Sequence, residues 1–194
     1  MAQKPANLPD RLPPELTQLS LDLAHLIQQA GGRLLLVGGC VRDIHLGSTP
    51  KEIDCEIQNI RIEKLKSVLS NKYTCHEVGK AFGVLKIKWH PAELSLPRTE
   101  VKTGSGHKGF SVEVDPSLPF EKSARRRDFT INAIGLDPLT GELLDPMGGI
   151  PDIQNRTLRH VGSAFGEDPL RVLRAMQFIA RFNLSPHPER SEEH

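Results

Sequence analysis

A strand-to-helix turn carries the first residues whose types and spacing fit phosphoryl chemistry. The apolar run 34–37 ends in Gly38 and Gly39, and Arg42 follows within a predicted helical turn. Glycines at such a turn let backbone N–H groups approach a phosphate closely, and the helix N-terminus adds partial positive charge. The turn is therefore a candidate phosphate site.

Acidic residues then occupy every other position of a predicted strand at 52–57. Alternation places Glu52, Asp54 and Glu56 on one face of that strand and apolar residues on the other. Clustered carboxylates facing a phosphate cradle are what Mg²⁺-dependent nucleotidyl transfer requires. Each stretch alone is also typical of an ordinary strand end or a solvated edge strand. Their short separation favours a nucleotide-handling enzyme.

A third stretch begins with three consecutive arginines at 125–127 and continues into Asp128 and Asn132. Arginine forks match phosphate oxygens in geometry and charge. Asp128 and Asn132 either engage a ribose hydroxyl or cap the local backbone. The sequence alone leaves both interpretations open.

A fourth stretch is a predicted helix over 166–181, with Asp168 as its candidate N-cap. Arg171, Arg174 and Gln177 follow at a spacing of three and share one helical face. The opposite, core-facing side is predicted to consist of four apolar residues, Val172, Leu173, Met176 and Ile179. Two arginines near a helix N-terminus oppose the macrodipole, which favours an anionic ligand or a base edge as their partner. The alternative is a capped helix with solvated arginines.

Bulk composition sets the broad class. The chain has 194 residues, 38% of them hydrophobic and 25% charged, with a net charge of +1, so any basic surface must be local. The three cysteines lack zinc-ligand spacing, which indicates a reducing compartment without structural zinc. The sequence has no signal-peptide core and no apolar run near the roughly 18 residues of a membrane span. We expect a soluble, cytoplasmic protein.

Hydrophobic periodicity predicts an α/β fold with a mixed sheet and flanking helices. Helices are predicted at 15–30, 41–46 and 61–69, and strands at 33–37, 52–57, 73–78, 82–89 and 93–96. A hairpin is predicted with strands at 134–136 and 142–144. The glycine-rich, basic segment 98–110 is predicted to be a loop.

The four stretches, in this order, resemble those of the class II tRNA nucleotidyltransferases (CCA-adding enzymes) and the bacterial poly(A) polymerases, within the DNA polymerase beta-like superfamily. The resemblance runs from about residue 34 to 182. It implies a nucleotidyltransferase head of the α/β (α+β) class with a mixed sheet of about five strands. It also divides the chain into a lead-in with a helix (1–30), the head (31–164) and the truncated start of a helical neck (165–194).

The same resemblance assigns roles near the turn. Gly39 and Arg42 contact the incoming triphosphate. Glu52 and Asp54 are the catalytic, metal-binding pair, with a glutamate where the family has an aspartate. Asp54 with Glu56 is the alternative pair of the same spacing.

Further roles follow for the later stretches. Arg127 with Asp128 binds the nucleotide ribose and phosphates. Asp168 and Arg171, within the Glu167–Arg171 motif, read the base, and Arg174 extends that nucleotide-binding surface. A glutamine, Gln177, stands where an arginine is frequent in the family. Three residues resemble its hinge motif: Asp145, Gly149 and Asp152.

The implied reaction adds CMP and AMP from CTP and ATP to the 3′ end of tRNA at a two-Mg²⁺ site, without a template. A carboxylate and an arginine side by side match the base edges of cytosine and adenine, whereas guanine and uracil present the opposite polarity. Poly(A) addition and partial CC- or A-addition are the alternatives within the family. A non-catalytic nucleotide- or RNA-binding remnant is the alternative of another class. No membrane partner is expected, and the oligomeric state stays open.

Overall fold

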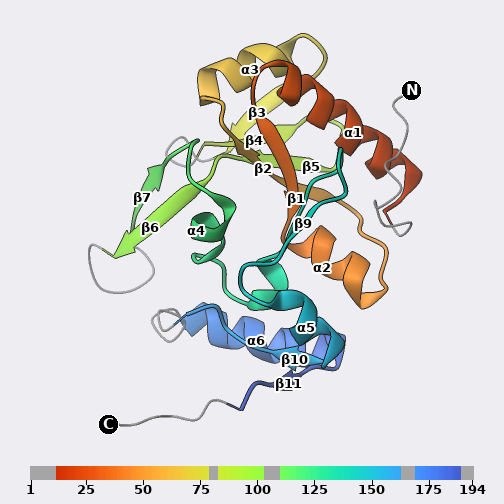
Figure 1. The fold of residues 1–194 in the computed structure, drawn as a ribbon, viewed down its shortest axis with the longest axis vertical. Helices are drawn as coiled ribbons and strands as arrows, with labels where there is room; N and C mark the ends of the chain where they lie inside the picture. The colour runs from red at the N-terminus through yellow and green to blue at the C-terminus, as the bar shows by residue number, and fades with distance from the viewer. Residues whose placement is uncertain (1–11, 79–82, 103–109, 163–168, 189–194) are drawn as a thin grey trace.

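A mixed sheet of seven strands, in the order β3-β4-β5-β2-β1-β8-β9, forms the centre of the structure (Figure 1). The computed structural model describes residues 12–78, 83–102, 110–162 and 169–188. The strands of this sheet are β1 (Arg33–Val37), β2 (Ile53–Gln58), β3 (Cys75–Val78), β4 (Val84–Ile87), β5 (Ala92–Ser95), β8 (Gly135–Leu136) and β9 (Leu143–Leu144). β2 and β5 run parallel, and the other neighbours run antiparallel.

The predicted mixed sheet is thus confirmed, with two strands more than expected. The additional strands, β8 and β9, are the two arms of the predicted hairpin and have two residues each. β8 pairs with the end of β1, so the hairpin extends the sheet instead of standing apart.

Helices α1 (Pro14–Gln29) and α3 (Ile62–Ser70) lie together on one face of the sheet (Figure 1). The apolar positions of the central strands point toward this face and are at most 2% exposed, as the alternation in β2 predicts: Leu34, Leu36, Ile53, Cys55 and Ile57. One face of α1 completes this main core through Leu16, Leu23 and Ile27.

The opposite face is covered only in part by the described residues. Helix α4 (Phe120–Ala124) packs over β1, and Phe120 and Ala124 form a second apolar cluster with Leu35 and Val37. Farther out, the register aligns polar side chains in one row across four strands: Asp54, Glu93, Lys86 and His76. Lys86 and His76 are exposed, so this part of the sheet presents a polar surface.

The prediction of a loop over 98–110 was wrong at both of its ends. β6 (Arg98–Lys102) and β7 (Phe110–Val114) form an antiparallel ribbon, which projects from the sheet in Figure 1. Residues 103–109 lie outside the described residues. The glycines of the segment are confined to 104–109, so the residues that favour a turn lie between the two strands and not within them.

The lower part of the molecule contains α2 (Gly39–Leu46), the 3₁₀ turn η1 (Thr130–Asn132), α5 (Gly149–Gln154), β10 (Thr157–Leu158), α6 (Pro169–Phe182) and β11 (Ser185–Pro186), as Figure 1 shows. The three residues of the expected hinge motif bind these elements together. Asp145 caps α5 by accepting the N–H groups of Gly149 at 2.7 Å and Ile150 at 2.9 Å. Asp152 accepts from the Thr130 hydroxyl and, at 3.0 Å, from Arg159 Nε.

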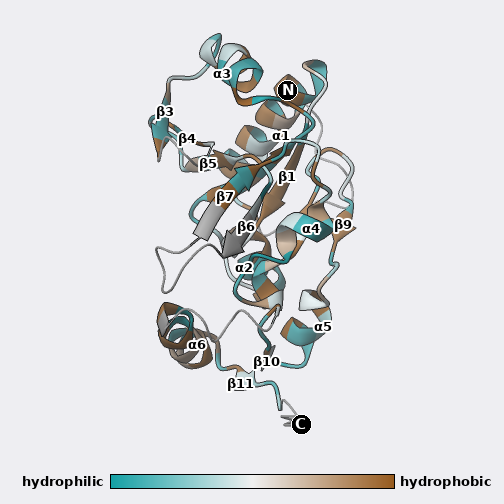
Figure 2. Ribbon diagram, turned by 90° about the vertical axis from the view of Figure 1, so that its left-hand side faces the viewer, coloured by the Kyte–Doolittle hydropathy of each residue, from teal (hydrophilic) through white to brown (hydrophobic). Residues whose placement is uncertain are grey.

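The predicted core face of α6 was wrong for three of its four residues. Val172, Leu173 and Met176 are 49%, 61% and 64% exposed. Phe178 is buried instead, and Ile179 packs beside it as predicted. Apolar residues lie on more than one side of this helix, so periodicity alone does not select the buried side. Figure 2 shows hydrophobic residues along much of the α6 ribbon.

The described helices include none that combines the length and apolar character needed to cross a bilayer.

Candidate functional site

The turn between β1 and α2 lies directly beside the acidic strand. Val37, the last residue of β1, pairs with Asp54 of β2. Gly38 follows with φ 70° and ψ −133°, a combination that essentially only glycine adopts without strain. The N-terminus of α2 therefore begins next to the Asp54 carboxylate.

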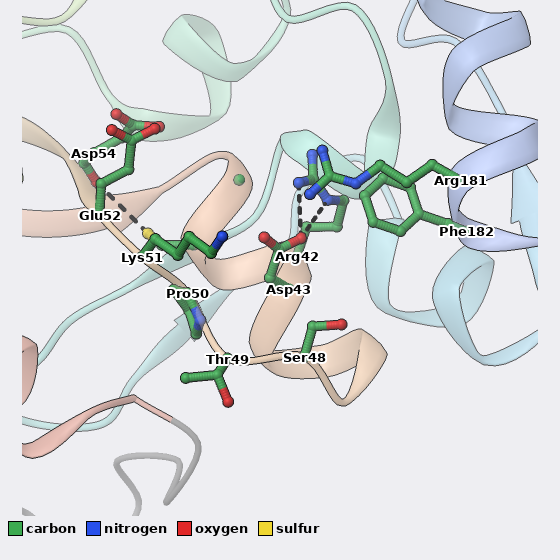
Figure 3. Close-up of a pocket in the computed structure, with 12 residues that line it drawn as sticks. Arg42, Asp43, Ser48, Thr49, Pro50, Lys51, Glu52, Asp54, Arg181 and Phe182 are labelled. Atoms are coloured by element: carbon green, nitrogen blue, oxygen red, sulfur yellow. Dashed lines mark hydrogen bonds and ion pairs between the residues drawn. The ribbon is translucent and has the colours of Figure 1, made fainter.

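A cleft of about 380 Å³ opens at this turn (Figure 3). Its lining residues are Gly39, Cys40, Arg42, Asp43, Ser48, Thr49, Pro50, Lys51, Glu52, Asp54, Arg181 and Phe182. The close-up shows the carboxylates of Glu52 and Asp54 together at one end of the cleft and the guanidinium groups of Arg42 and Arg181 together at the other. The cleft is thus electrostatically polarised.

Glu52 and Asp54 differ in their surroundings. β2 begins at Ile53, so Glu52 precedes the strand and is exposed, whereas Asp54 is partly buried. Burial, together with the nearby charges of Glu52 and Glu93, raises the pKa of Asp54 to about 6, against the opposing effects of Arg127 and Lys86. These surroundings destabilise the ionised form of the carboxyl group, and a cation bound beside it would stabilise that form.

Glu56 shares the strand face of Asp54 but is separated from the cleft. Its side chain is fully buried beneath α4, where Oε1 accepts the Ser123 hydroxyl at 2.7 Å. Oε2 lies 3.8 Å from Arg127 Nη2. The predicted alternation is correct, but Glu56 is absent from the cleft lining, unlike Glu52 and Asp54.

Arg127 lies between the buried and the cleft-facing carboxylates. Its side chain is 14% exposed, and burial lowers the pKa of its guanidinium against the opposing charges of Glu56 and Asp54. A Cβ placed on Gly38 would lie 3.4 Å from Arg127 Nη1. The guanidinium therefore reaches the phosphate-site turn from the third motif.

Arg42 is held from several sides. It is 7% exposed, and its Nε and Nη2 donate to Asp43 Oδ1 at 2.9 and 2.7 Å. Its Nη1 donates to Asn132 Oδ1 at 2.8 Å. The Phe178 and Phe182 rings of α6 lie 5.0 and 4.6 Å from its guanidinium carbon, within cation–π range. Arg42 thus joins α2 to η1 and α6.

The capping interpretation holds for Asp128 in this structure. Its Oδ1 accepts the Phe129 N–H at 2.8 Å and the Asn132 amide at 2.9 Å. Its Oδ2 accepts from Arg174 at 2.7 and 2.8 Å. Together with the contact between Arg42 and Asn132, these bonds form a continuous polar network from α2 to α6.

The residues that the sequence analysis expects to read the base lie only partly within the described structure. Glu167 and Asp168 are outside the described residues. Arg171, on the first turn of α6, donates to the carbonyl oxygen of Arg126 at 3.4 Å. Gln177 is exposed. The third and fourth motifs nevertheless meet, through the contact of Arg171 and through the bonds between Arg174 and Asp128.

Sequence reasoning assigned roles to four of the twelve lining residues, and the eight that it missed include Lys51, Arg181 and Phe182. Arg181 lies seven residues after Arg174, so the helical repeat that grouped the arginines already placed it on the same side. Lys51 directly precedes Glu52, and no pattern in the sequence indicates that it lines the cleft. Figure 3 shows its ammonium group between the carboxylates and the arginines.

The described residues contain no cluster of three or more side chains able to ligate a metal. Glu52 and Asp54 are two hard oxygen donors, and Asp54 carries an unfavourable charge. Mg²⁺ is commonly held by one or two carboxylates together with substrate phosphates. The donor set fits that mode of binding and does not form a closed protein cage.

The sequence is similar to curated multifunctional CCA proteins over most of its length. The multifunctional CCA protein of Xanthomonas campestris pv. campestris (strain B100) is 46% identical over 149 residues, which are 77% of this chain and 35% of the relative. That of Nitrosococcus oceani is 46% identical over 154 residues, 79% of this chain and 36% of the relative. The chain spans just over a third of the length of these curated relatives.

Solved structures share the fold. The Bacillus stearothermophilus CCA-adding enzyme in complex with CTP matches with a TM-score of 0.73 and 30% identity, covering 88% of this chain and 40% of that one. A tRNA nucleotidyltransferase complexed with a primer tRNA and an incoming ATP analog matches with a TM-score of 0.69 and 27% identity, covering 86% of this chain and 46% of that one.

A family model described as the poly(A) polymerase head domain matches residues 34–159, which contain the turn, both cleft carboxylates and the arginine motif. The chain therefore belongs to the poly(A) polymerase head domain family.

Proposed function

We propose that this chain is the catalytic head of a template-independent nucleotidyltransferase that adds CMP and AMP, from CTP and ATP, to the 3′ end of tRNA. The polarised cleft is the observation that carries this proposal, since Glu52 and Asp54 stand opposite Arg42 and Arg181. Nucleotidyl transfer needs this separation of charge, because cations must gather at the attacked α-phosphate while donors hold the rest of the triphosphate.

In this proposal the triphosphate lies along the start of α2. The backbone N–H groups after Gly38 and the helix N-terminus attract phosphate oxygens. Arg42 has three of its N–H groups committed to Asp43 and Asn132, which orients the remaining two. Arg127 contributes charge from below the turn, beside Gly38.

Glu52 and Asp54 would hold Mg²⁺ jointly with the substrate phosphates. The metal, when bound, would favour deprotonation of the attacking 3′-hydroxyl and neutralise the pyrophosphate that leaves. Asp54 supports this role through its raised pKa, because a cation relieves the repulsion from Glu52 and Glu93. Glu56, engaged with Ser123 and Arg127, is better suited to orienting Arg127.

For base selection we propose Asp168 and Arg171, with Arg174 extending the nucleotide surface through its bond to Asp128. An acceptor beside a donor matches the amino group and ring nitrogen of cytosine and adenine. The similarity to structures named as complexes with CTP and with an incoming ATP analog supports this choice of nucleotides.

The proposal includes the division of the chain into a head at 31–164 and the start of a helical neck at 165–194. It also includes a cytoplasmic location, where tRNA is processed. The tRNA partner is supported by the similarity to an enzyme named as a complex with a primer tRNA.

Two measurements test the function. The first compares the binding of CTP, ATP, UTP and GTP in the presence of Mg²⁺, and we expect CTP and ATP to bind more tightly. The second supplies tRNA ending at the discriminator base, or in CC, with CTP and ATP separately and together. We expect ordered addition of C, C and A, lowered by about two orders of magnitude or more in Asp54→Ala.

Glu63→Gln on α3 is the matched control, because it removes an exposed carboxylate remote from the cleft. Unlimited addition of A would identify a poly(A) polymerase instead. Tight CTP and ATP binding without extension of either tRNA would contradict the enzymatic assignment of this chain.

A further inference from the structure

The chain contains a single tryptophan, Trp89, and presents it on the turn between β4 and β5. The side chain is 80% exposed. One exposed apolar residue is ordinary on a protein surface. The backbone of Trp89 is not ordinary, because its φ of 63° lies in the left-handed region that bulky residues rarely adopt. Such strain persists where the surrounding structure enforces it, and it is common at functional sites.

Backbone hydrogen bonds fix this turn on both sides of Trp89. The Lys88 N–H donates to the Thr74 carbonyl oxygen at 2.8 Å, and the His90 N–H donates to Ile87 at 3.3 Å. The turn therefore holds its tryptophan in one place, which lowers the entropy cost of binding a partner there.

The turn also lies at the catalytic end of the sheet. The Ile53 N–H, directly after Glu52, donates to the Pro91 carbonyl oxygen at 2.9 Å. β2 and β5 run parallel, and Ile53 pairs with Ala92. The start of β5 and the turn before it are thus fixed beside the first carboxylate of the cleft.

Cations accompany the exposed ring. Lys88 Nζ lies 4.2 Å from the centre of the Trp89 ring. Lys86, two residues earlier, belongs to the polar row that leads across the open sheet face to Asp54, and its Nζ lies 3.1 Å from Glu93 Oε2. An aromatic platform with adjacent lysines is the combination that binds single-stranded nucleic acid, through base stacking and phosphate contacts.

We propose that the β4–β5 turn is the docking surface for the single-stranded 3′ end of the RNA primer, with Trp89 stacking on a base and Lys88 facing the adjacent phosphate. This inference rests on the proposed function. In that reaction the terminal nucleotide of the primer changes after every addition. A surface that holds the primer must accept each of these ends, and stacking is tolerant of base identity whereas hydrogen-bonded readout is not.

Because Trp89 is the only tryptophan, fluorescence excited at the red edge of the absorption band, where Tyr73 hardly absorbs, reports on it alone. The probe is an acceptor-stem RNA minihelix with a single-stranded 3′ end, compared with the same stem ending in a blunt duplex. We expect the minihelix with the overhang to quench the fluorescence and the blunt stem to leave it nearly unchanged. Equal quenching by both, or by neither, would overturn the proposal.

Substitutions separate stacking from a merely structural role. Glycine adopts the left-handed backbone freely, so Trp89→Gly removes the ring and keeps the turn. With labelled minihelix, we expect Trp89→Gly to weaken binding about five- to tenfold, Lys88→Ala to weaken it less, and Trp89→Phe to retain most of it. Leu143→Ala, which truncates an exposed residue at the opposite edge of the sheet, is the matched control.

CTP binding distinguishes this inference from the proposed function. Trp89→Gly is expected to bind CTP as the original chain does and to melt at no lower temperature. Unchanged RNA affinity in Trp89→Gly, with CTP binding intact, would refute the docking surface and leave the proposed function in place. Failure of the original chain to bind CTP would count against the proposed function, whatever the fluorescence shows.

Discussion

Asp54 Oδ2 and Arg127 Nη1 meet at one glycine, since a Cβ built on Gly38 would lie 3.4 Å from each of them. Both groups thus approach the turn that leads into α2, one from the acidic strand and one from the arginine motif. The backbone conformation of Gly38, with φ 70° and ψ −133°, is what places this turn between a carboxylate and a guanidinium. Gly38 is therefore a residue of the site even though it has no functional group.

Gly38→Ala should impair both the fold and the site. Its φ of 70° and ψ of −133° are strained for any residue with a Cβ, which costs about 1–3 kcal/mol in the free energy of unfolding. The added methyl group would lie in ordinary van der Waals contact with both Asp54 and Arg127, so the strained backbone of the turn, and not a clash, is what shifts the two groups. We expect CTP affinity, measured in Mg²⁺ by calorimetry, to fall about tenfold, a factor equivalent to about 1.4 kcal/mol.

Gly31→Ala is the control for this substitution. Gly31 also has a positive φ, of 89°, but no atom outside its chain neighbours lies within 4 Å of its would-be Cβ. It should lose stability and keep its affinity for CTP. Equal CTP affinities in the two variants would contradict the role of the Gly38 backbone in placing Asp54 and Arg127.

Glu56→Gln should lower stability without changing the dependence on Mg²⁺. The substitution leaves an acceptor for Ser123 but removes the buried charge that faces Arg127, and breaking a buried ion pair costs about 3–5 kcal/mol when both partners are fully enclosed. Because the two groups are 3.8 Å apart, we expect the free energy of unfolding, measured in urea, to fall by about 2 kcal/mol.

Glu52→Gln should raise the Mg²⁺ concentration needed for CTP binding without lowering stability. A higher Mg²⁺ requirement in Glu56→Gln, with stability intact, would identify Glu56 as a ligand instead.

The pKa of Asp54 makes a prediction about pH. Its pKa is raised from 3.8 to about 6 in the folded chain, so between these values the folded state binds more protons than the unfolded state. The free energy of unfolding therefore falls as pH rises through this window. An asparagine side chain cannot ionise, so Asp54→Asn does not lose stability as the pH rises. We expect its free energy of unfolding to exceed that of the original chain by about 1–3 kcal/mol at pH 7.5 but not at pH 4.

Urea unfolding at the two pH values measures this difference, and groups common to both proteins cancel from it. Added Mg²⁺ at pH 7.5 should stabilise the original chain more than Asp54→Asn, because ligands that bind only the folded state add to its stability. A stability difference that is the same at pH 4 and pH 7.5 would show that Asp54 is not destabilised by its surroundings.

Local chemistry made part of this site predictable from sequence. The paired glycines predict a turn and the alternation at 52–57 predicts a strand face, and both patterns depend only on residues close together in the sequence. The pairing of these two segments then places the turn beside Asp54. The burial of Glu56 does not, because its partner Ser123 lies 67 residues away in the sequence. Periodicity also did not predict the buried side of α6, because Phe178 is buried by partners far away in the sequence, Phe129 and Arg42.

The network from α2 to α6 gives a final prediction, centred on Asn132. Its side chain accepts from Arg42 at 2.8 Å and donates to Asp128 at 2.9 Å, and Asp128 in turn holds Arg174. Asn132→Ala leaves the buried Arg42 short of an acceptor, which costs about 1–3 kcal/mol. Because Arg42 stacks on Phe178 and Phe182, its displacement should loosen α6.

Hydrogen exchange measures that loosening directly. We expect amides of α6 to exchange about tenfold faster or more in Asn132→Ala, while those of α1, on the far side of the sheet, keep their rates. Asn71→Ala, which truncates an exposed asparagine after α3, is the matched control.

Combining Arg174→Ala with Asn132→Ala should raise the exchange rates little further, because the effects of residues that act through one shared partner are not additive. Unchanged α6 exchange in Asn132→Ala, or full additivity with Arg174→Ala, would mean that α6 is held by its aromatic packing alone.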